Sequence, residues 1–251
     1  MQQLTNSWIT FPTGNPTAKL RLFCFHYAGG NSLCFQPWVQ QLPDDIEICP
    51  IELPGRGRKI QLTPLNRLEC IIEALSQQIQ PYLDKPFAFF GHSMGGLVSF
   101  ELTRRLFEKY KVSPVHLFIS ARQAPHLPIA SAPMHALSDS DFIAKLREYS
   151  GTPAAVLENQ ALMEIFLPML RADFEVLETY TYEHRPPVGC PIAVFGGLQD
   201  HRVSLKGLDA WREHTQQDFS VQRFRGGHFY INQDHSLVIQ QILKHLRSVD
   251  K

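Results

Sequence analysis

The sequence predicts an α/β fold, with a central and mostly parallel sheet flanked by helices and one helical insertion. Six short segments are almost wholly apolar and have the length of strands that are covered on both faces. Helical patterns separate several of these segments, which is the alternation expected of βαβ units. The alternation stops between residues 124 and 190, where no convincing strand pattern occurs. We therefore expect residues 1–123 and 191–251 to form one α/β core, with residues 124–190 inserted into it.

The elements of this core follow one another along the chain. Leucine and isoleucine recur at helical spacing over residues 65–83, which predicts an amphipathic helix there. The strands are expected at residues 20–27, 46–53, 87–90, 115–120, 192–197 and 219–224. The helices of the core are expected at residues 32–42, 65–83, 97–107 and 236–246.

The inserted segment is expected to be helical. Ser138 or Asp139 can cap its first helix. A longer helical pattern follows, and because it is apolar on more than one face, it should cover something besides the sheet. Prolines mark the ends and joints of the insertion, as in a cap that can shift relative to the core. The apolar residues of the longer pattern include Ile165, Phe166, Leu167, Met169, Leu170 and Phe174.

The composition favours a cytoplasmic protein. Lysine plus arginine and aspartate plus glutamate are equal at 24 each, so the charge suggests neither nucleic acid nor a membrane surface as partner. The first residues lack the positive start and apolar run of a signal peptide, and no segment approaches the roughly 18 apolar residues that span a bilayer. The five cysteines are scattered without metal-ligand spacing, and we expect them to be reduced.

The strongest motif is Gly-His-Ser-Met-Gly at residues 91–95, directly after an expected strand and directly before a helix. This pattern forms a sharp turn that holds the serine hydroxyl outward, and the turn requires small neighbours. Ser93 is therefore the candidate nucleophile, although the bare five-residue pattern also arises by chance. A serine nucleophile needs a base, and the base needs an acid that fixes its tautomer.

Candidates for both partners follow later in the chain. Asp200 lies just beyond the strand expected at 192–197, where the carboxyl end of a parallel strand places it beside the nucleophile. His228 follows the last expected strand, and two glycines before it let the loop turn back toward the sheet edge. The order Ser93, Asp200, His228 is that of the α/β-hydrolase fold. An ordinary loop aspartate is the alternative interpretation of Asp200, and Asp173 is the reserve candidate for the acid.

A glycine turn at residues 26–30 ends the first expected strand at the same sheet edge. Such a turn can offer a backbone N–H to a developing oxyanion. The N–H of Met94, next to the nucleophile, would be the second donor. A tight turn without a ligand is the alternative.

The motifs together resemble those of the type II thioesterases that accompany nonribosomal peptide synthetases and polyketide synthases. The resemblance covers nearly the whole chain and rests on FHYAGG, IELPGRGRK, FFGHSMGGLVSFEL, ISARQAP, FGGLQDHRV and RGGHFY, in that order. It implies that Ser93 is the nucleophile, Asp200 the acid and His228 the base. It also implies that the backbone N–H groups of Ala28 and Met94 bind the oxyanion. The inserted segment would be the lid of this family.

The resemblance also implies a substrate. The substrate would be an acyl or aminoacyl thioester on the phosphopantetheine arm of a carrier protein. Its hydrolysis would clear stalled or misprimed synthases. The charges of residues 54–59 would meet an acidic carrier or belong to a structural turn. No pattern for a nucleotide, flavin or nicotinamide and no paired metal ligands occur, so neither a cofactor nor a metal is expected. An apolar substrate pocket would be lined by Tyr27, Phe166, Met169, Leu170, Phe174 and Phe229.

Other functions are compatible with the same residues. A medium-chain fatty acyl thioesterase or a small-molecule carboxylesterase would use the same triad, because a thiol leaves with little acid assistance and the triad does not reveal the leaving group. A cyclase or transferase would need an acceptor other than water at the acyl-enzyme. A non-catalytic α/β-hydrolase scaffold that binds a ligand is the alternative of another class, and the presence of all three triad residue types argues against it.

Overall fold

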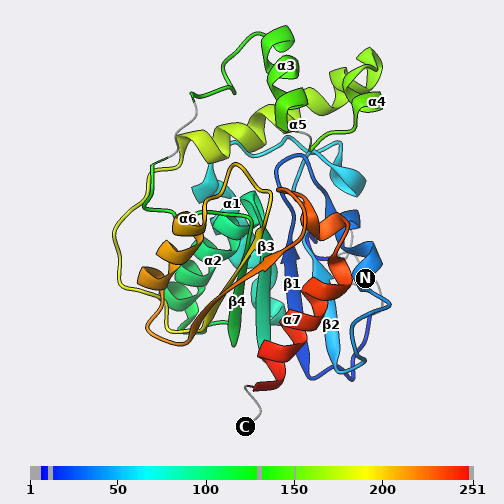
Figure 1. The fold of residues 1–251 in the computed structure, drawn as a ribbon. Helices are drawn as coiled ribbons and strands as arrows, with labels where there is room; N and C mark the ends of the chain where they lie inside the picture. Colours follow the sequence, from blue (N-terminus) through cyan, green and yellow to red (C-terminus); the bar gives the residue numbers. More distant parts are fainter. Residues whose placement is uncertain (1–6, 11–13, 129–131, 150, 249–251) are drawn as a thin grey trace.

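The computed structural model describes residues 7–10, 14–128, 132–149 and 151–248, and its centre is one six-stranded sheet. The strand order is β2-β1-β3-β4-β5-β6, and every neighbouring pair of these strands is parallel (Figure 1). The α/β fold and its six strands are thereby confirmed. The strands are β1 (Leu20–Phe25), β2 (Ile46–Pro50), β3 (Phe87–His92), β4 (His116–Ser120), β5 (Ile192–Gly197) and β6 (Phe219–Phe224).

Helices cover both faces of the sheet (Figure 1). One face packs against α1 (Leu68–Ile79), α2 (Met94–Tyr110), α6 (Leu205–Asp209) and the 3-10 helix η4 (Ala210–His214). The other face packs against η1 (Ser32–Trp38) and α7 (His235–Ser248). No helix within the described ranges combines the length and the apolar character that crossing a membrane requires. Short 3-10 helices also occur at η2 (Gly57–Lys59), η3 (Gln80–Tyr82) and η5 (Tyr230–Asn232).

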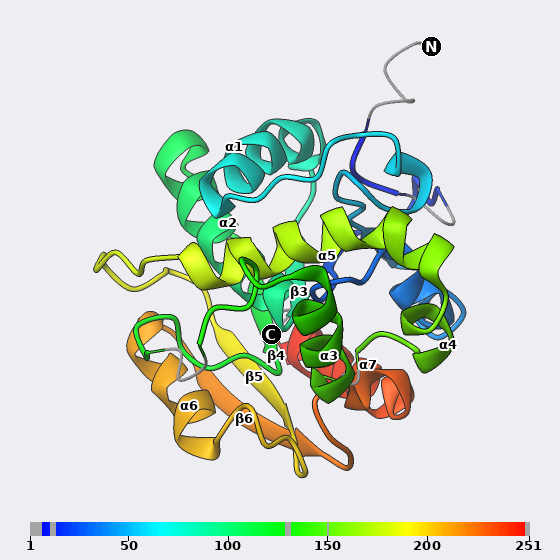
Figure 2. The ribbon, with the colours of Figure 1, turned by 90° about the horizontal axis from the view of Figure 1, so that it is seen from above.

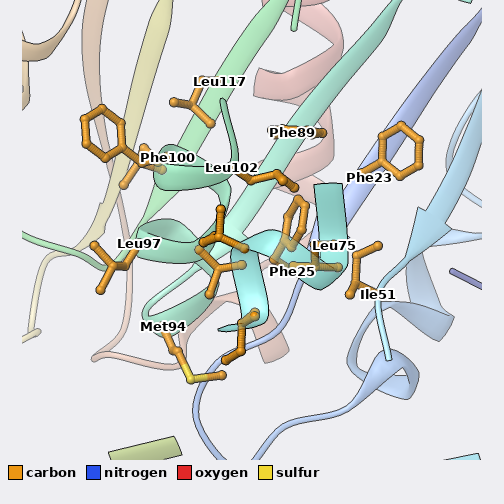
Figure 3. Packing of buried hydrophobic residues seen from close by; sticks show 14 of the residues in the cluster. Phe23, Phe25, Ile51, Leu75, Phe89, Met94, Leu97, Phe100, Leu102 and Leu117 are labelled. Atoms are coloured by element: carbon orange, nitrogen blue, oxygen red, sulfur yellow. The ribbon is translucent and has the colours of Figure 1, made fainter. Parts of the chain in front are cut away.

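Successive strand residues point into two separate apolar cores. Phe23 and Phe89 belong to the core beneath α1 and α2, whereas Leu22 and Phe90 belong to the core beneath α7. Figure 3 shows part of the first core, where side chains of β1, β3 and β4 meet those of α1 and α2. Because β1 to β5 are mostly buried on both faces, these strands are largely apolar in the sequence, whereas the edge strand β6 is only partly buried and carries Ser220, Gln222 and Arg223. This packing fixes the end of β3, from which Ser93 follows.

The segment after β1 differs from the helix expected over 32–42. It forms the 3-10 helix η1, which ends at Trp38 and contains Pro37. Proline has no N–H to donate, so it cannot support the hydrogen bonds of a regular α-helix interior. Phe35 and Trp38 pack on Phe90 of the sheet with ring centroids 6.0 and 4.8 Å away, and this aromatic packing holds the segment in place.

Three helices follow β4 and precede β5: α3 (Asp139–Tyr149), α4 (Ala154–Leu157) and α5 (Gln160–Thr179). They lie beyond the carboxyl ends of the strands, and α5 runs across the central strands of the sheet (Figure 1, Figure 2). The described residues of 124–190 contribute no strand to the sheet. The hydroxyl of Ser138 accepts the N–H of Asp141 and so caps α3. Buried side chains of the three helices form an apolar cluster of their own.

Candidate active site

Ser93 lies in the turn between β3 and α2 with a strained backbone. Its φ of 54° and ψ of −109° lie outside the regions that a residue with a side chain usually adopts. Its N–H donates to the carbonyl of Ser120 at 2.7 Å, which anchors the turn on β4. A Cβ on Gly91 would lie 2.1 Å from the carbonyl oxygen of Gly95, and a Cβ on Gly95 would lie 2.1 Å from that of Phe25. The turn therefore requires both glycines.

Two hydrogen bonds join Ser93, His228 and Asp200. Nε2 of His228 lies 3.0 Å from Oγ of Ser93, and Nδ1 of His228 lies 2.8 Å from Oδ2 of Asp200. Asp200 and His228 are in the loops after β5 and β6, which are neighbouring parallel strands. This arrangement suits a serine whose proton passes to an imidazole that a carboxylate holds in place.

The carboxyl group of Asp200 is buried, since its side chain is 1% exposed. Burial on its own raises the pKa of Asp200, but the hydrogen bond and charge of His228 and two backbone N–H groups outweigh it, so the pKa is lowered. Oδ1 accepts the N–H of Arg202 at 2.9 Å, while Oδ2 faces His228. An ionised Asp200 favours a proton on Nδ1 of the imidazole, which leaves Nε2 to face the serine.

Two backbone amides adjoin the same place. Ala28, in the turn after β1, lines a cavity together with Ser93. The N–H of Ala28 has no acceptor among the residues that the structure describes. Met94 is the first residue of α2, so its N–H has no acceptor within the helix. Both amides are therefore available for a developing negative charge.

A cavity of about 450 Å³ opens at Ser93 between the sheet edge and helices α3 and α5. Its lining includes four of the residues expected to form a substrate pocket, which are Tyr27, Leu170, Phe174 and Phe229. Phe166 and Met169 do not line it, and they pack in the apolar cluster of the three helices instead. The helical repeat accounts for the difference, because Leu170 and Phe174 lie one turn apart on the same face of α5. Phe166 lies on that face as well, but one turn beyond the cavity. Met169 lies on a neighbouring face of the helix.

Comparison with known proteins decides the family. The thioesterase domain family matches residues 20–249. The chain belongs to this thioesterase family. The resemblance seen in the sequence motifs is thereby confirmed.

The thioesterase resembles proteins from several biosynthetic systems. It is 46% identical over 244 residues to gramicidin S biosynthesis protein GrsT of Aneurinibacillus migulanus, covering 97% of this chain and 95% of GrsT. It is 32% identical over 224 residues to the medium-chain S-acyl fatty acid synthase thioesterase of Rattus norvegicus, covering 86% and 83% of the two chains. Among solved structures, the type II thioesterase BorB from the borrelidin biosynthetic cluster matches with a TM-score of 0.86 at 34% identity, covering 95% and 97%.

Two charged residues of the thioesterase lie in places that the sequence did not suggest. The carboxylate of Asp173, the reserve acid, binds the guanidinium of Arg56, whereas His228 is bound to Asp200. Arg56 is 2% exposed, so it cannot meet a carrier at the surface. The interpretation of residues 54–59 as a carrier-facing charge cluster is therefore wrong for Arg56.

Sequence reasoning also missed a charged residue of the cavity. Arg122 lies two residues after the end of β4 and lines the cavity of the thioesterase. Burial lowers the pKa of Arg122 to about 10, and its buried Nε has no hydrogen-bond partner in the described part of the chain. Its place just after a parallel strand, at the edge where Ser93 lies, is the signal that could have revealed it. Among the described residues, no group of three or more His, Cys, Asp or Glu side chains is arranged to hold a metal ion.

Proposed function

We propose that the chain is a serine hydrolase that cleaves acyl or aminoacyl thioesters from the phosphopantetheine arm of carrier proteins and so clears misprimed or stalled synthases. The observation that carries this proposal is the unbroken hydrogen-bonded series from Ser93 through His228 to Asp200, at a cavity with apolar walls. Similarity to GrsT and BorB, which come from biosynthetic systems for gramicidin S and borrelidin, supports the choice of substrate.

The proposed reaction has two stages. In acylation, Oγ of Ser93 attacks the thioester carbonyl carbon while Nε2 of His228 takes the hydroxyl proton, and the amides of Ala28 and Met94 bind the oxyanion. The carbon–sulfur bond then breaks, and the imidazolium returns the proton to the leaving thiolate. In deacylation, water attacks the acyl-enzyme with His228 as base, which releases the acid and restores Ser93.

We further propose that the helices between β4 and β5 form a lid. Residues 124–190 would form this lid, while residues 1–123 and 191–251 would form the hydrolase core. Leu170 and Phe174 of α5 line the cavity opposite Ser93, which supports this division. Acyl chains would lie among Tyr27, Leu170, Phe174 and Phe229, so the lid would contribute to the choice of substrate.

The proposed partner is an acyl- or aminoacyl-carrier protein of a synthase, and the proposed location is the cytoplasm. All five cysteines are free thiols, which supports a reducing compartment. The family relationship supports a carrier-bound substrate, since a type II thioesterase from a biosynthetic cluster is among the similar structures.

A second candidate is hydrolysis of medium-chain fatty acyl thioesters. It is favoured by the similarity to the medium-chain fatty acid synthase thioesterase of Rattus norvegicus. Tyr149, Leu170, Phe174 and Leu177 give the cavity an apolar wall that also suits such a chain.

Rates with carrier-bound and free substrates test the proposal. Acetyl, aminoacyl and octanoyl groups would be offered on a phosphopantetheinylated carrier, beside the matching coenzyme A thioesters and p-nitrophenyl esters. We expect kcat/KM to be highest for the carrier with short or aminoacyl groups. Highest values for octanoyl thioesters would favour the second candidate. Equal or faster hydrolysis of simple esters would contradict both.

A further inference from the structure

A buried ion pair joins the loop after β2 to the middle of α5. The guanidinium of Arg56 binds the carboxylate of Asp173 through two hydrogen bonds, 2.8 Å from Nη1 to Oδ2 and 2.7 Å from Nη2 to Oδ1. The side chains are 3% and 0% exposed. In such a place a charge is strongly destabilising unless it is fully paired, so each partner depends on the other.

Both partners also hold the turn that follows β1. Oδ2 of Asp173 accepts the N–H of Gly29 at 2.7 Å, and Nη1 of Arg56 donates to the carbonyl of Gly30 at 3.3 Å. Leu170, three residues before Asp173, packs on the same turn, since a Cβ on Gly29 would lie 2.7 Å from its Cδ2. Helix α5 therefore contacts the turn through one charged and one apolar side chain.

The hydrogen bonds of the turn leave the N–H of Ala28 available. The N–H of Gly29 is taken by Asp173, and the N–H of Gly30 donates to the carbonyl of Tyr27 at 2.9 Å. The N–H of Ala28 has no acceptor within the described residues, and Ala28 lines the cavity. An amide stabilises an oxyanion well only if its direction is fixed before the reaction begins.

We propose that Asp173, held by Arg56, is a positioning residue that fixes this turn so that the N–H of Ala28 is aimed at the oxyanion. The inference rests on the proposed function. Asp173 acts through the backbone of the turn and does not touch the reacting atoms. Because acylation and deacylation both pass through an oxyanion, a loosened turn slows both steps and lowers kcat, while binding of the ground-state substrate is unchanged.

The variant Asp173→Asn tests this role. It keeps the shape of the side chain but removes the charge that pairs with Arg56. We expect kcat to fall about tenfold to a hundredfold with KM nearly unchanged, which is a smaller loss than deletion of an oxyanion donor causes. The affinity for an alkyl trifluoromethyl ketone, which forms a tetrahedral oxyanion on Ser93, should fall by a similar factor. The affinity for a non-reactive thioether analogue of the substrate should not change.

Two further variants separate positioning from general damage. Glu175→Gln is the matched control, because it breaks another ion pair of α5, with Arg67 at 3.3 Å, without contact to the turn. Its kcat and ketone affinity should equal those of the wild type. Arg56→Lys keeps the charge but loses the bidentate geometry, so it should lower kcat by a smaller factor than Asp173→Asn does. If Asp173→Asn does not fold, the variant Arg56→Lys tests the positioning role in its place.

The outcomes are distinct. Unchanged kcat and ketone affinity in a folded Asp173→Asn or Arg56→Lys variant would overturn the positioning role, as would a rise in KM alone or an equal loss in Glu175→Gln. Wild type and Ser93→Ala are assayed in the same series. If the wild type shows no Ser93-dependent thioester hydrolysis, the proposed function fails. If it does and Asp173→Asn is equally fast, only the positioning role fails.

Discussion

The hydroxyl of Tyr230 lies 2.5 Å from Oγ of Ser120, at the end of β4 and next to the candidate triad. The same Oγ lies 2.8 Å from Nδ1 of His92, and the carbonyl of Ser120 accepts the N–H of Ser93. Tyr230 follows His228 by two residues. Ser120 therefore connects the turn that carries the serine with the loop that carries the histidine.

Tyr230→Phe should weaken this connection. The side chain is fully buried, and loss of its hydroxyl leaves Ser120 with one partner fewer, so we expect the free energy of unfolding to fall by about 1–2 kcal/mol. A less firmly held His228 loop should also lower kcat several-fold. Urea unfolding and steady-state kinetics measure the two effects. Tyr110→Phe, at the far end of α2, is the control and should change neither; equal values for both variants would contradict the prediction.

Asp200→Asn should lower kcat by about ten-thousandfold with the fold intact, because an amide does not hold the imidazole in the required tautomer. Ser93→Ala should lose turnover and labelling by a fluorophosphonate probe. Asp209→Asn, at an exposed position of α6, serves as control. A loss of only a few-fold in Asp200→Asn would remove Asp200 from the proposed triad.

His116 should make the protein sensitive to acid. Its ring is buried against Phe118 with centroids 4.4 Å apart, and neither ring nitrogen has a partner in the described residues. Burial, with a smaller contribution from the charge of His245, lowers its pKa to about 3. The unfolded value is about 6.5, so between these values the unfolded chain binds more protons, and stability falls as the pH falls.

His116→Phe should therefore flatten the pH dependence of stability. The wild type should lose about 1.4 kcal/mol per pH unit more than the variant as the pH falls from about 6 to about 4. Urea unfolding at the two pH values measures this difference. The exposed His201 offers the control His201→Gln, which should follow the wild type. Parallel curves for His116→Phe and wild type would show that His116 does not contribute.

Leu177→Phe should narrow the cavity, because Leu177 lines its wall on α5. We expect kcat/KM for an octanoyl thioester to fall about tenfold relative to that for an acetyl thioester, the scale on which one or two methylenes are discriminated. Leu167→Phe is the matched control, since Leu167 packs in the apolar cluster of α3, α4 and α5. A uniform loss for both chain lengths would mean that the acyl chain lies elsewhere.

Local sequence signals sufficed for the strands and for the turn around Ser93. Continuous apolar runs identify strands buried on both faces, and Gly91 and Gly95 are required by backbone contacts that any such turn must make. The positions of Asp200 and His228 followed from one rule, that loops after parallel strands meet at one sheet edge.

The pairing of residues that are far apart in the chain could not be predicted from such local signals. Arg56 and Asp173 are 117 residues apart, and no local pattern shows that two charges at such a distance neutralise each other in the interior. The failure for Phe166 and Met169 has a related cause: the apolar pattern of a helix covered on several sides does not tell which stripe faces a cavity and which faces other helices. The 3-10 helix that ends at Trp38 was also not predicted, because its position depends on aromatic packing against the sheet.

Helix α5 contributes Leu170, Phe174 and Leu177 to the cavity wall and, between them, Asp173 to the ion pair behind the turn. Under selection for a new acyl group, these neighbouring positions are not independent, since a shift of the helix that widens the cavity also moves Asp173. Divergence of specificity in this lineage should then proceed by side-chain exchange on a helix that keeps its position. For the same reason, a chimaera that receives α5 from a relative should also receive the loop containing Arg56.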